Sequence, residues 1–191
     1  MTEPDPGPID IDPDGRRIRV LFWVAVILLG IGLAACVAEG ANGPPDPFLE
    51  GLGSTFDEVA FRVQPVGDGL PSTTEFCAWQ ADSDAERARG LMEVTDTSLD
   101  GHDGMVFRFD ADHQGGFYMR NTRIPLSIAF FDAAGAFVAA LDMEPCPDDV
   151  ADCPTYGPDQ PYRTALEVPT GRLPTMGIGA GTRLELVGPC G

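Results

Sequence analysis

From Val59 to the C-terminus, the chain is a series of short apolar stretches separated by Gly, Pro and Asp turn residues. About eight of these stretches have the length and the β-branched and aromatic content of strands. The segment FFDAAGAFV predicts a hairpin whose tip is formed by residues 132–135. Strands at this spacing predict a mainly β fold, either a small β sandwich or a barrel.

One stretch among the strands has a helical pattern. In SDAERARGLM, Ser83 and Glu86 fit the S-x-x-E capping box, and Gly90 fits a helix stop. These signals predict one short helix over residues 84–89. A further helical turn in TGRLPTMGIG is compatible with the pattern, although Pro174 weakens it.

The N-terminal part has a different composition. Residues 1–19 are rich in Pro, Asp and Gly and end in three arginines, which predicts a disordered acidic N-terminus with a basic end. Residues 20–36 form an apolar run that ends in LAAC. Arginines, an apolar run and small residues are the parts of a secretory signal. LAAC resembles the bacterial lipobox, which predicts that Cys36 is lipid-modified and becomes the mature N-terminus.

An uncleaved transmembrane helix is the alternative, because the apolar run to residue 38 is close to the roughly 20 residues that cross hydrocarbon. Either interpretation anchors the protein in the membrane and places the remaining chain on the extracytoplasmic face. Residues 37–57 are rich in Gly and Pro and predict a flexible tether. The domain itself is expected over residues 58–191.

The cysteines are consistent with export. The chain has five, and outside the anchor they are Cys77, Cys146, Cys153 and Cys190. Four cysteines allow three disulfide connectivities. We favour Cys146 with Cys153, because they bracket a short acidic loop, which leaves Cys77 with Cys190. A C-x6-C metal pair is the alternative, but the sequence has no second pair at zinc-like spacing, so no metal site and no cofactor are expected.

The charge is strongly acidic. The formal net charge is -18, and every basic residue is an arginine. Such a surface is repelled by nucleic acid phosphates, so no nucleic acid partner is expected.

A cluster of polar residues supplies the first candidate site. The cluster comprises Arg87, Arg89, Arg120, Asn121, Thr122 and Arg123. Forked guanidinium groups and an amide suit a carboxylate, a phosphate or a sugar, which indicates an anionic small molecule or a glycan as the ligand. The alternative is structural, because Asn and Thr form turns, the arginines have many acids to pair with, and a proline follows this polar run. We favour the structural alternative.

Five blocks of the chain resemble a known family. They are ERARGLM (86–92), DGMVFRF (103–109), FYMRNTRIPLSIAFFD (117–132), MEPC with CPTYGP (143–158), and ALEVPTGRLPTMGIGAGTRLEL (165–186). Their order resembles that of domain-of-unknown-function family 192, also called uncharacterised protein family 0127. The resemblance covers about residues 74–188. It implies a small, mainly β domain that is often exported or anchored, and it implies no assigned activity.

The chain departs from the family pattern at several positions. Tyr118 stands where the family has Trp, Arg120 where it has Lys, and Ser127 where it has Asp. If that Asp were catalytic in the family, this chain would lack the activity. Glu144 and Glu167 lie in family-like blocks, so they are the better acidic candidates, and each could instead pair with an arginine.

Two other classes of function have weaker patterns. Met92, Met105 and Met119 with His102 and His113 would suit copper in an exported protein, but methionines beside apolar residues more often fill core gaps. A triad of Ser127 with a histidine and an acid can be written, yet the chain has no G-x-S-x-G elbow, phosphate loop or dinucleotide fingerprint.

The sequence therefore favours an extracytoplasmic, membrane-tethered binding or accessory module rather than an enzyme. A hydrolytic or carbohydrate-active enzyme with a pocket around Asn121 is the alternative, and a copper-binding periplasmic-type domain is the second. A pocket with a carboxyl of raised pKa beside Asn121 would favour catalysis. Convergence of the three methionine sulfurs on one cavity would favour copper.

Overall fold

The computed structural model describes residues 49–191, except residues 54, 68 and 71. The expected acidic N-terminus, the signal or membrane segment with Cys36, and most of the expected tether lie outside these residues. Among the helices of the described part, none is long and apolar enough to cross a membrane.

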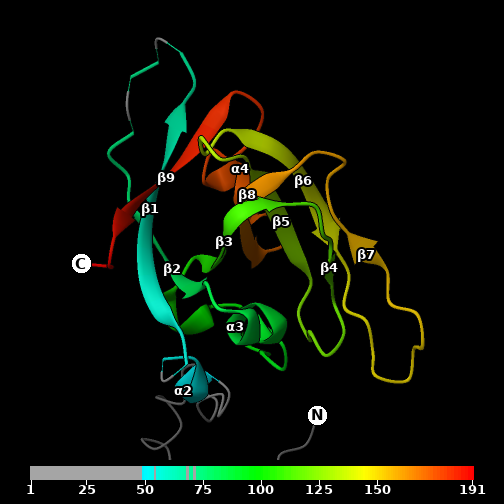
Figure 1. The fold of residues 1–191 in the computed structure, drawn as a ribbon. Helices are drawn as coiled ribbons and strands as arrows, with labels where there is room; N and C mark the ends of the chain where they lie inside the picture. The colour runs from blue at the N-terminus through cyan, green and yellow to red at the C-terminus, as the bar shows by residue number, and fades with distance from the viewer. Residues whose placement is uncertain (1–48, 54, 68, 71) are drawn as a thin grey trace, which may run out of the picture. The chain divides into compact units, whose positions relative to one another are not determined.

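Seven strands form one curled sheet, a half-barrel (Figure 1). The strands are β1 (Asp57–Pro65), β2 (Phe76–Ala81), β3 (Gly104–His113), β5 (Leu126–Phe131), β6 (Phe137–Met143), β8 (Tyr162–Pro169) and β9 (Thr182–Gly188). Their order across the sheet is β6-β5-β8-β3-β2-β1-β9. Only the β2–β3 pair among them is parallel. The mainly β prediction is confirmed.

The edge strands of the half-barrel meet at one point. Ala136, just before β6, forms an antiparallel bridge with Arg183 of β9. The amide of Leu184 also donates to the carbonyl oxygen of Gly135 at 2.9 Å. The sheet is therefore drawn toward closure at the tip of the β5–β6 hairpin, where the turn predicted from the sequence lies.

The regular helices are short. They are α2 (Leu49–Leu52), α3 (Asp84–Arg89), α4 (Arg172–Thr175) and the 3-10 turn η1 (Leu99–Gly101). The capping box that predicted α3 is present, because the Ser83 hydroxyl accepts from the Glu86 amide and the Glu86 carboxylate accepts from the Ser83 amide. Gly90 ends α3 at a positive φ of 48°.

The packed part of the chain begins before residue 58. Leu52 in α2 and Phe56 just before β1 are both buried in the core. A second, two-stranded sheet pairs β4 (Phe117–Tyr118) with β7 (Thr155–Tyr156). The strand β7 has no apolar alternation in the sequence, which explains why it was not predicted.

Apolar side chains cover both faces of the large sheet. Met105 and Phe107 of β3 pack in one cluster, under α3 and β4, whereas Val106 between them packs in the other cluster, against α4. Successive residues of a strand point to opposite faces. A strand that is buried on both faces has a nearly continuous run of apolar residues in its sequence, as β5 has in LSIAFF.

Two disulfides join distant and local segments. Cys77 of β2 pairs with Cys190 after β9, and Cys146 pairs with Cys153 across the loop that leads from β6 to β7. These are the two pairs that the sequence favours. The first ties the middle of the sheet to the C-terminus, and the second holds the acidic loop.

Candidate ligand-binding cavity

A cavity of about 380 Å³ lies between α3 and the face of the large sheet that β3 and β8 form. Residues from α3 and the turn after it line one side, and residues from β3, β4 and β8 line the other. Gly90 shapes this side, because a β-carbon there would lie 3.3 Å from the Phe107 ring. The absence of a side chain at Gly90 thus lets the chain turn closely over the aromatic wall.

The carboxyl of Glu167 is the most unusual group in the cavity. Glu167 is 6% exposed and lies in the second half of β8. Its register partners are Met105 on β3 and Ile128 on β5, which are both fully buried. Burial raises the pKa of Glu167 to about 8. Among the described residues, no side chain or amide donates a hydrogen bond to this carboxyl, which faces the cavity.

Aromatic rings form much of the cavity wall. Phe107 and Phe117 meet edge to face, with ring centres 4.9 Å apart. Phe109 stacks on His113 at 4.2 Å and meets Tyr162 edge to face at 5.5 Å. The Tyr162 hydroxyl donates to the carbonyl oxygen of Gly115 at 2.9 Å, and burial raises the Tyr162 pKa. Most of the wall is therefore apolar or already hydrogen-bonded.

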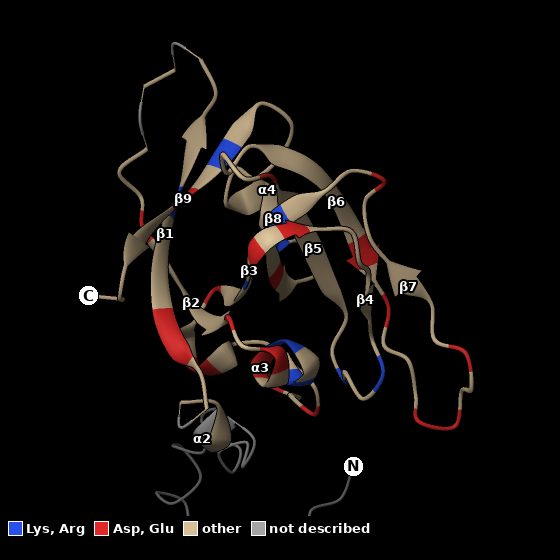
Figure 2. Cartoon of the chain, in the orientation of Figure 1, with Lys and Arg blue, Asp and Glu red and all other residues tan. Residues whose placement is uncertain are grey.

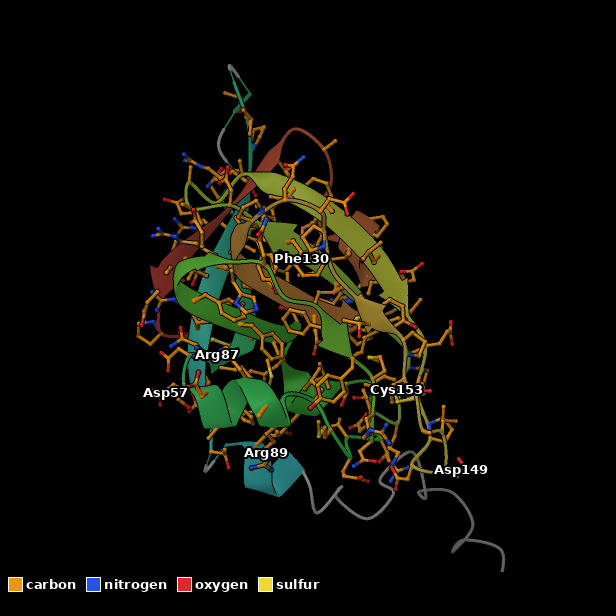
Figure 3. The ribbon with its side chains drawn as sticks, turned by 45° about the vertical axis from the view of Figure 1, so that its right-hand side comes forward. Asp57, Arg87, Arg89, Phe130, Asp149 and Cys153 are labelled. Carbon is orange, nitrogen blue, oxygen red and sulfur yellow. A yellow bond between two sulfur atoms is a disulfide. The ribbon has the colours of Figure 1, made fainter. Side chains whose placement is uncertain are left out.

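The two arginines of α3 line the mouth but have partners within the protein. Arg87 donates to the Asp84 carboxylate at 2.6 Å and to the Arg108 carbonyl oxygen at 2.7 Å, and its guanidinium lies over the Phe109 ring. Arg89 donates to the Thr55 hydroxyl at 2.6 Å and lies over the Phe56 ring. Figure 3 shows Arg89 beside α2.

The bend after β4 is not a single polar site. Arg123 binds both carboxylate oxygens of Glu93, at 2.9 and 3.0 Å, which raises the Arg123 pKa. Arg120 donates to the Ala151 carbonyl oxygen at 2.9 Å. Figure 2 shows the basic bend next to the acidic loop that leads to β7. Both arginines thus hold this corner of the fold together.

Asn121, Thr122 and Glu144 lie in different surroundings. Asn121 has a left-handed backbone, with φ of 60°, and its carbonyl oxygen accepts from the Glu93 amide at 2.7 Å. Thr122 is buried and lines the cavity. Glu144 is exposed. Of the candidates from the sequence, the structure brings Arg87, Arg89 and Thr122 to the cavity and places Arg120, Asn121, Arg123 and Glu144 outside its lining.

The methionines and Ser127 have structural surroundings. Met105 and Met119 are fully buried in the core, and Met92 lines the cavity. Ser127 is buried, donates to the Asp142 carboxylate at 2.5 Å and accepts from the Gly171 amide at 3.3 Å. The Ser127 hydroxyl is therefore bonded to a neighbouring strand and to the loop before α4, with no histidine among these partners.

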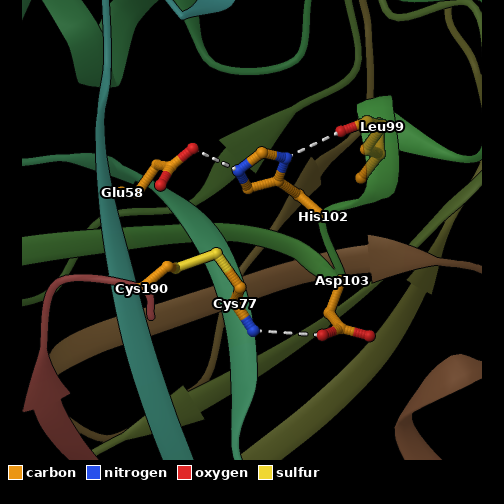
Figure 4. The surroundings of a disulfide bond; sticks show 6 residues. All are labelled: Glu58, Cys77, Leu99, His102, Asp103 and Cys190. Carbon is orange, nitrogen blue, oxygen red and sulfur yellow. Dashed lines mark hydrogen bonds and ion pairs between the residues drawn. A yellow bond between two sulfur atoms is a disulfide. The ribbon is translucent and has the colours of Figure 1, made fainter.

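A second group of polar residues surrounds the Cys77–Cys190 disulfide (Figure 4). His102 stacks on Trp79 at 3.8 Å, and its ring nitrogens face Glu58 at 3.0 Å and the Leu99 carbonyl oxygen at 3.1 Å. Glu58, Cys77 and His102 place potential metal ligands within 4.8 Å of one another. A metal would need the Cys77 thiolate, and this sulfur is bonded to Cys190.

A larger hollow of about 750 Å³ lies over β1, β2 and β9, and it includes Glu58 and Trp79. It is an open depression with acidic residues along its side. The cavity under α3 is the better candidate site, because a buried carboxyl faces it beside several aromatic side chains.

Sequence reasoning identified Glu167 only as an acidic candidate and missed the aromatic wall. The available signal was an acid in the middle of the apolar stretch ALEV. The wall could not be predicted, because it combines residues from β3, β4 and β8, which are far apart in the sequence.

The fold and the cavity define a small, mainly β domain with a candidate ligand site under α3. The chain belongs to domain-of-unknown-function family 192 (DUF192), described as Uncharacterized ACR, which it matches over residues 69–186. The family expected from the sequence blocks is therefore confirmed. Among curated proteins, none matches the chain.

Two solved structures are similar. One is a proposed transcription regulator from Sinorhizobium meliloti, with 23% identity and a TM-score of 0.56, covering 69% of this chain and 95% of that one. The other is a protein of unknown function from Novosphingobium aromaticivorans, with 27% identity and a TM-score of 0.51, covering 64% of this chain and 82% of that one. The first likeness, at this identity, shows the fold alone.

Proposed function

We propose that this domain is a binding module that takes a small molecule in the cavity under α3 and is tethered to the extracytoplasmic face of a membrane. The observation that carries the proposal is the buried Glu167 carboxyl, which opens on the cavity without a partner among the described residues.

A buried acid without a hydrogen-bond partner costs the folded state free energy. Burying a polar group without a hydrogen bond costs on the order of 1–3 kcal/mol, and buried polar groups in native proteins are nearly always paired. Glu167 faces a space that a ligand can enter, so a ligand could supply the missing partner. Enclosed apolar pockets with one perturbed titratable group are the usual form of small-molecule sites.

The surroundings of the arginines bear on the kind of ligand. An anionic ligand at Arg87 would have to compete with the Asp84 carboxylate. A neutral ring such as that of a sugar needs no such exchange, because it can stack on Phe107 or Phe117 and accept from a protonated Glu167. The acidic surface also supports our expectation that nucleic acid is not a partner.

A ligand screen on the full-length chain tests the proposal. A compound that binds only the folded state raises the melting temperature by mass action. We expect hits among small molecules in the wild type and a smaller shift in melting temperature for those hits in Glu167→Gln. Glu144→Gln is the matched control, because Glu144 is exposed and outside the cavity. If no compound class raises the melting temperature, the binding role is wrong.

Hydrolysis is the second candidate function. The raised pKa of Glu167 would keep its proton at neutral pH, as a general acid requires. Asp84 is the other carboxylate that lines the cavity, and it is paired with Arg87. Turnover of chromogenic glycosides or esters that disappears in Glu167→Gln would favour this alternative over binding.

A further inference from the structure

We propose that the ligand of the cavity is a small organic cation, a substituted ammonium whose charged head lies among the aromatic rings with the Glu167 carboxylate as its counter-ion. This inference rests on the proposed binding function and names the chemical class of the ligand. It departs from the anionic or glycan ligand that the sequence indicates.

The polar groups of the cavity favour a cation. The guanidinium groups of Arg87 and Arg89 already have oxygen partners and each lies over an aromatic ring. Glu167, by contrast, is buried in the cavity wall and has no hydrogen-bond donor among the described residues. An incoming cation would complete an ion pair with Glu167, whereas Arg87 is already paired with the Asp84 carboxylate.

The aromatic rings favour the same class. Phe107, Phe117 and Tyr162 line the cavity close to one another, with the Phe107 and Phe117 centres 4.9 Å apart and the Phe117 and Tyr162 centres 6.4 Å apart. The faces of aromatic rings attract ammonium groups, and cages of such rings bind quaternary ammonium ligands. In the same wall the Arg87 guanidinium already lies over the Phe109 ring, with its central carbon 5.1 Å from the ring centre.

The size of the cavity and the charge of the chain agree with a small cation. A volume of about 380 Å³ is near the lower end of small-molecule pockets, so a compact head group fits better than an oligosaccharide. The net charge of -18 raises the local concentration of cations around the protein.

Protonation of Glu167 must be coupled to binding of a cation. Burial keeps the Glu167 proton until about pH 8, whereas the ion pair requires the ionised form. Binding below that pH therefore releases a proton, and the apparent affinity rises about tenfold per pH unit up to about pH 8. The other titratable or charged groups that line the cavity are Asp84, Arg87, Arg89, His113, Tyr118 and Tyr162. A Glu167→Gln profile separates their contribution from that of Glu167.

Calorimetry with a matched pair of probes tests the inference. Choline is the cationic probe and 3,3-dimethylbutan-1-ol is its neutral isostere, each titrated into the full-length chain at constant ionic strength between pH 6 and pH 9. We expect choline to bind more tightly than the isostere at pH 8, with a dissociation constant that falls about tenfold per pH unit from pH 6 to pH 8. The isostere should show no such dependence.

Variants identify the residues involved. Glu167→Gln should raise the dissociation constant of choline at least tenfold and leave that of the isostere unchanged. Glu144→Gln should bind both probes as the wild type does. If Glu167→Gln does not fold, Phe117→Leu provides the second test, because it removes a ring and should weaken choline more than the isostere.

The outcomes distinguish this inference from the binding role itself. If the isostere binds as well as choline, or if choline binding is independent of pH and of Glu167, the proposal of a cationic ligand is wrong and the binding role stands. If neither probe binds but an uncharged or anionic compound raises the melting temperature through Glu167, the cation proposal is again wrong. If no compound binds at all, both proposals fail.

Discussion

Glu167 on β8 lies opposite Met105 on β3 in the antiparallel register, so a carboxyl group shares one sheet face with a fully buried thioether side chain. Such a position suits a neutral acid and disfavours a carboxylate, because ionisation would place a charge in an apolar environment. The ionisation of Glu167 should therefore contribute to the pH dependence of the domain's stability.

The first prediction concerns this pH dependence. In the folded state burial raises the pKa of Glu167 to about 8, above its ordinary value of 4.5. The unfolded chain thus loses the proton first, and the stabilisation by the neutral acid is complete below pH 4.5 and lost as pH rises through 8. Over this window the loss approaches about 5 kcal/mol, at roughly 1.4 kcal/mol per pH unit.

Urea unfolding at pH 5 and pH 9 measures this loss. Glu167→Gln should lose less stability than the wild type over the same interval, since its amide does not ionise. The exposed Glu144→Gln should follow the wild type. If the wild type and Glu167→Gln lose the same free energy of unfolding between pH 5 and pH 9, Glu167 does not titrate in this window.

The second prediction concerns the cap of α3, which holds one side of the cavity. Ser83→Ala removes the hydroxyl that accepts from the Glu86 amide. We expect a loss of about 1 kcal/mol in the free energy of unfolding, as for other N-cap serines. Thermal unfolding of Thr73→Ala, at an exposed loop position, is the control. If Ser83→Ala has the same free energy of unfolding as the wild type, the cap does not contribute to stability.

Local signals predicted most of the elements, whereas the site depends on long-range contacts. The capping box fixed the ends of α3, and apolar stretches with turn residues between them located the main strands. The role of the bend after β4 could not be derived in this way, because Arg123 pairs with Glu93, thirty positions away in the sequence. Among the described residues no arginine pairs with Glu167, and this also follows from the position of β8 in the sheet.

The third prediction concerns Asn121, around which the alternative enzyme hypothesis placed a pocket. Its left-handed backbone favours Gly over Ala, and its buried Oδ1 atom has no hydrogen-bond partner among the described atoms. Asn121→Gly should therefore be more stable than Asn121→Ala by about 1 kcal/mol in urea unfolding. Asn121→Gly should also keep the ligand response that Glu167→Gln loses. If Asn121→Gly loses that ligand response, Asn121 takes part in ligand binding.

The fourth prediction concerns the N-terminus. We propose cleavage before Cys36 with lipid attachment, on the basis of the arginines, the apolar run and LAAC. Mass spectrometry of the membrane fraction should find a mature chain that begins at lipid-modified Cys36, and Cys36→Ser should prevent this modification. An intact N-terminus starting at Met1 would instead support an uncleaved anchor helix.

The fifth prediction compares the two disulfides. The Cys77–Cys190 bond closes a loop with a sequence separation of 113, and the Cys146–Cys153 bond one of 7. A crosslink restricts the unfolded chain more when it closes a longer loop, so the chain-entropy model gives about 5 kcal/mol for the first and about 2 kcal/mol for the second.

Double Cys→Ser variants, unfolded in urea, measure the two contributions separately. Replacing Cys77 and Cys190 should cost about twice as much as replacing Cys146 and Cys153. The short bond holds the acidic loop beside Arg120 and Arg123 rather than the sheet, so its loss should leave the cavity able to bind. Equal costs would indicate that local packing, rather than restriction of the unfolded chain, determines how much each disulfide stabilises the fold.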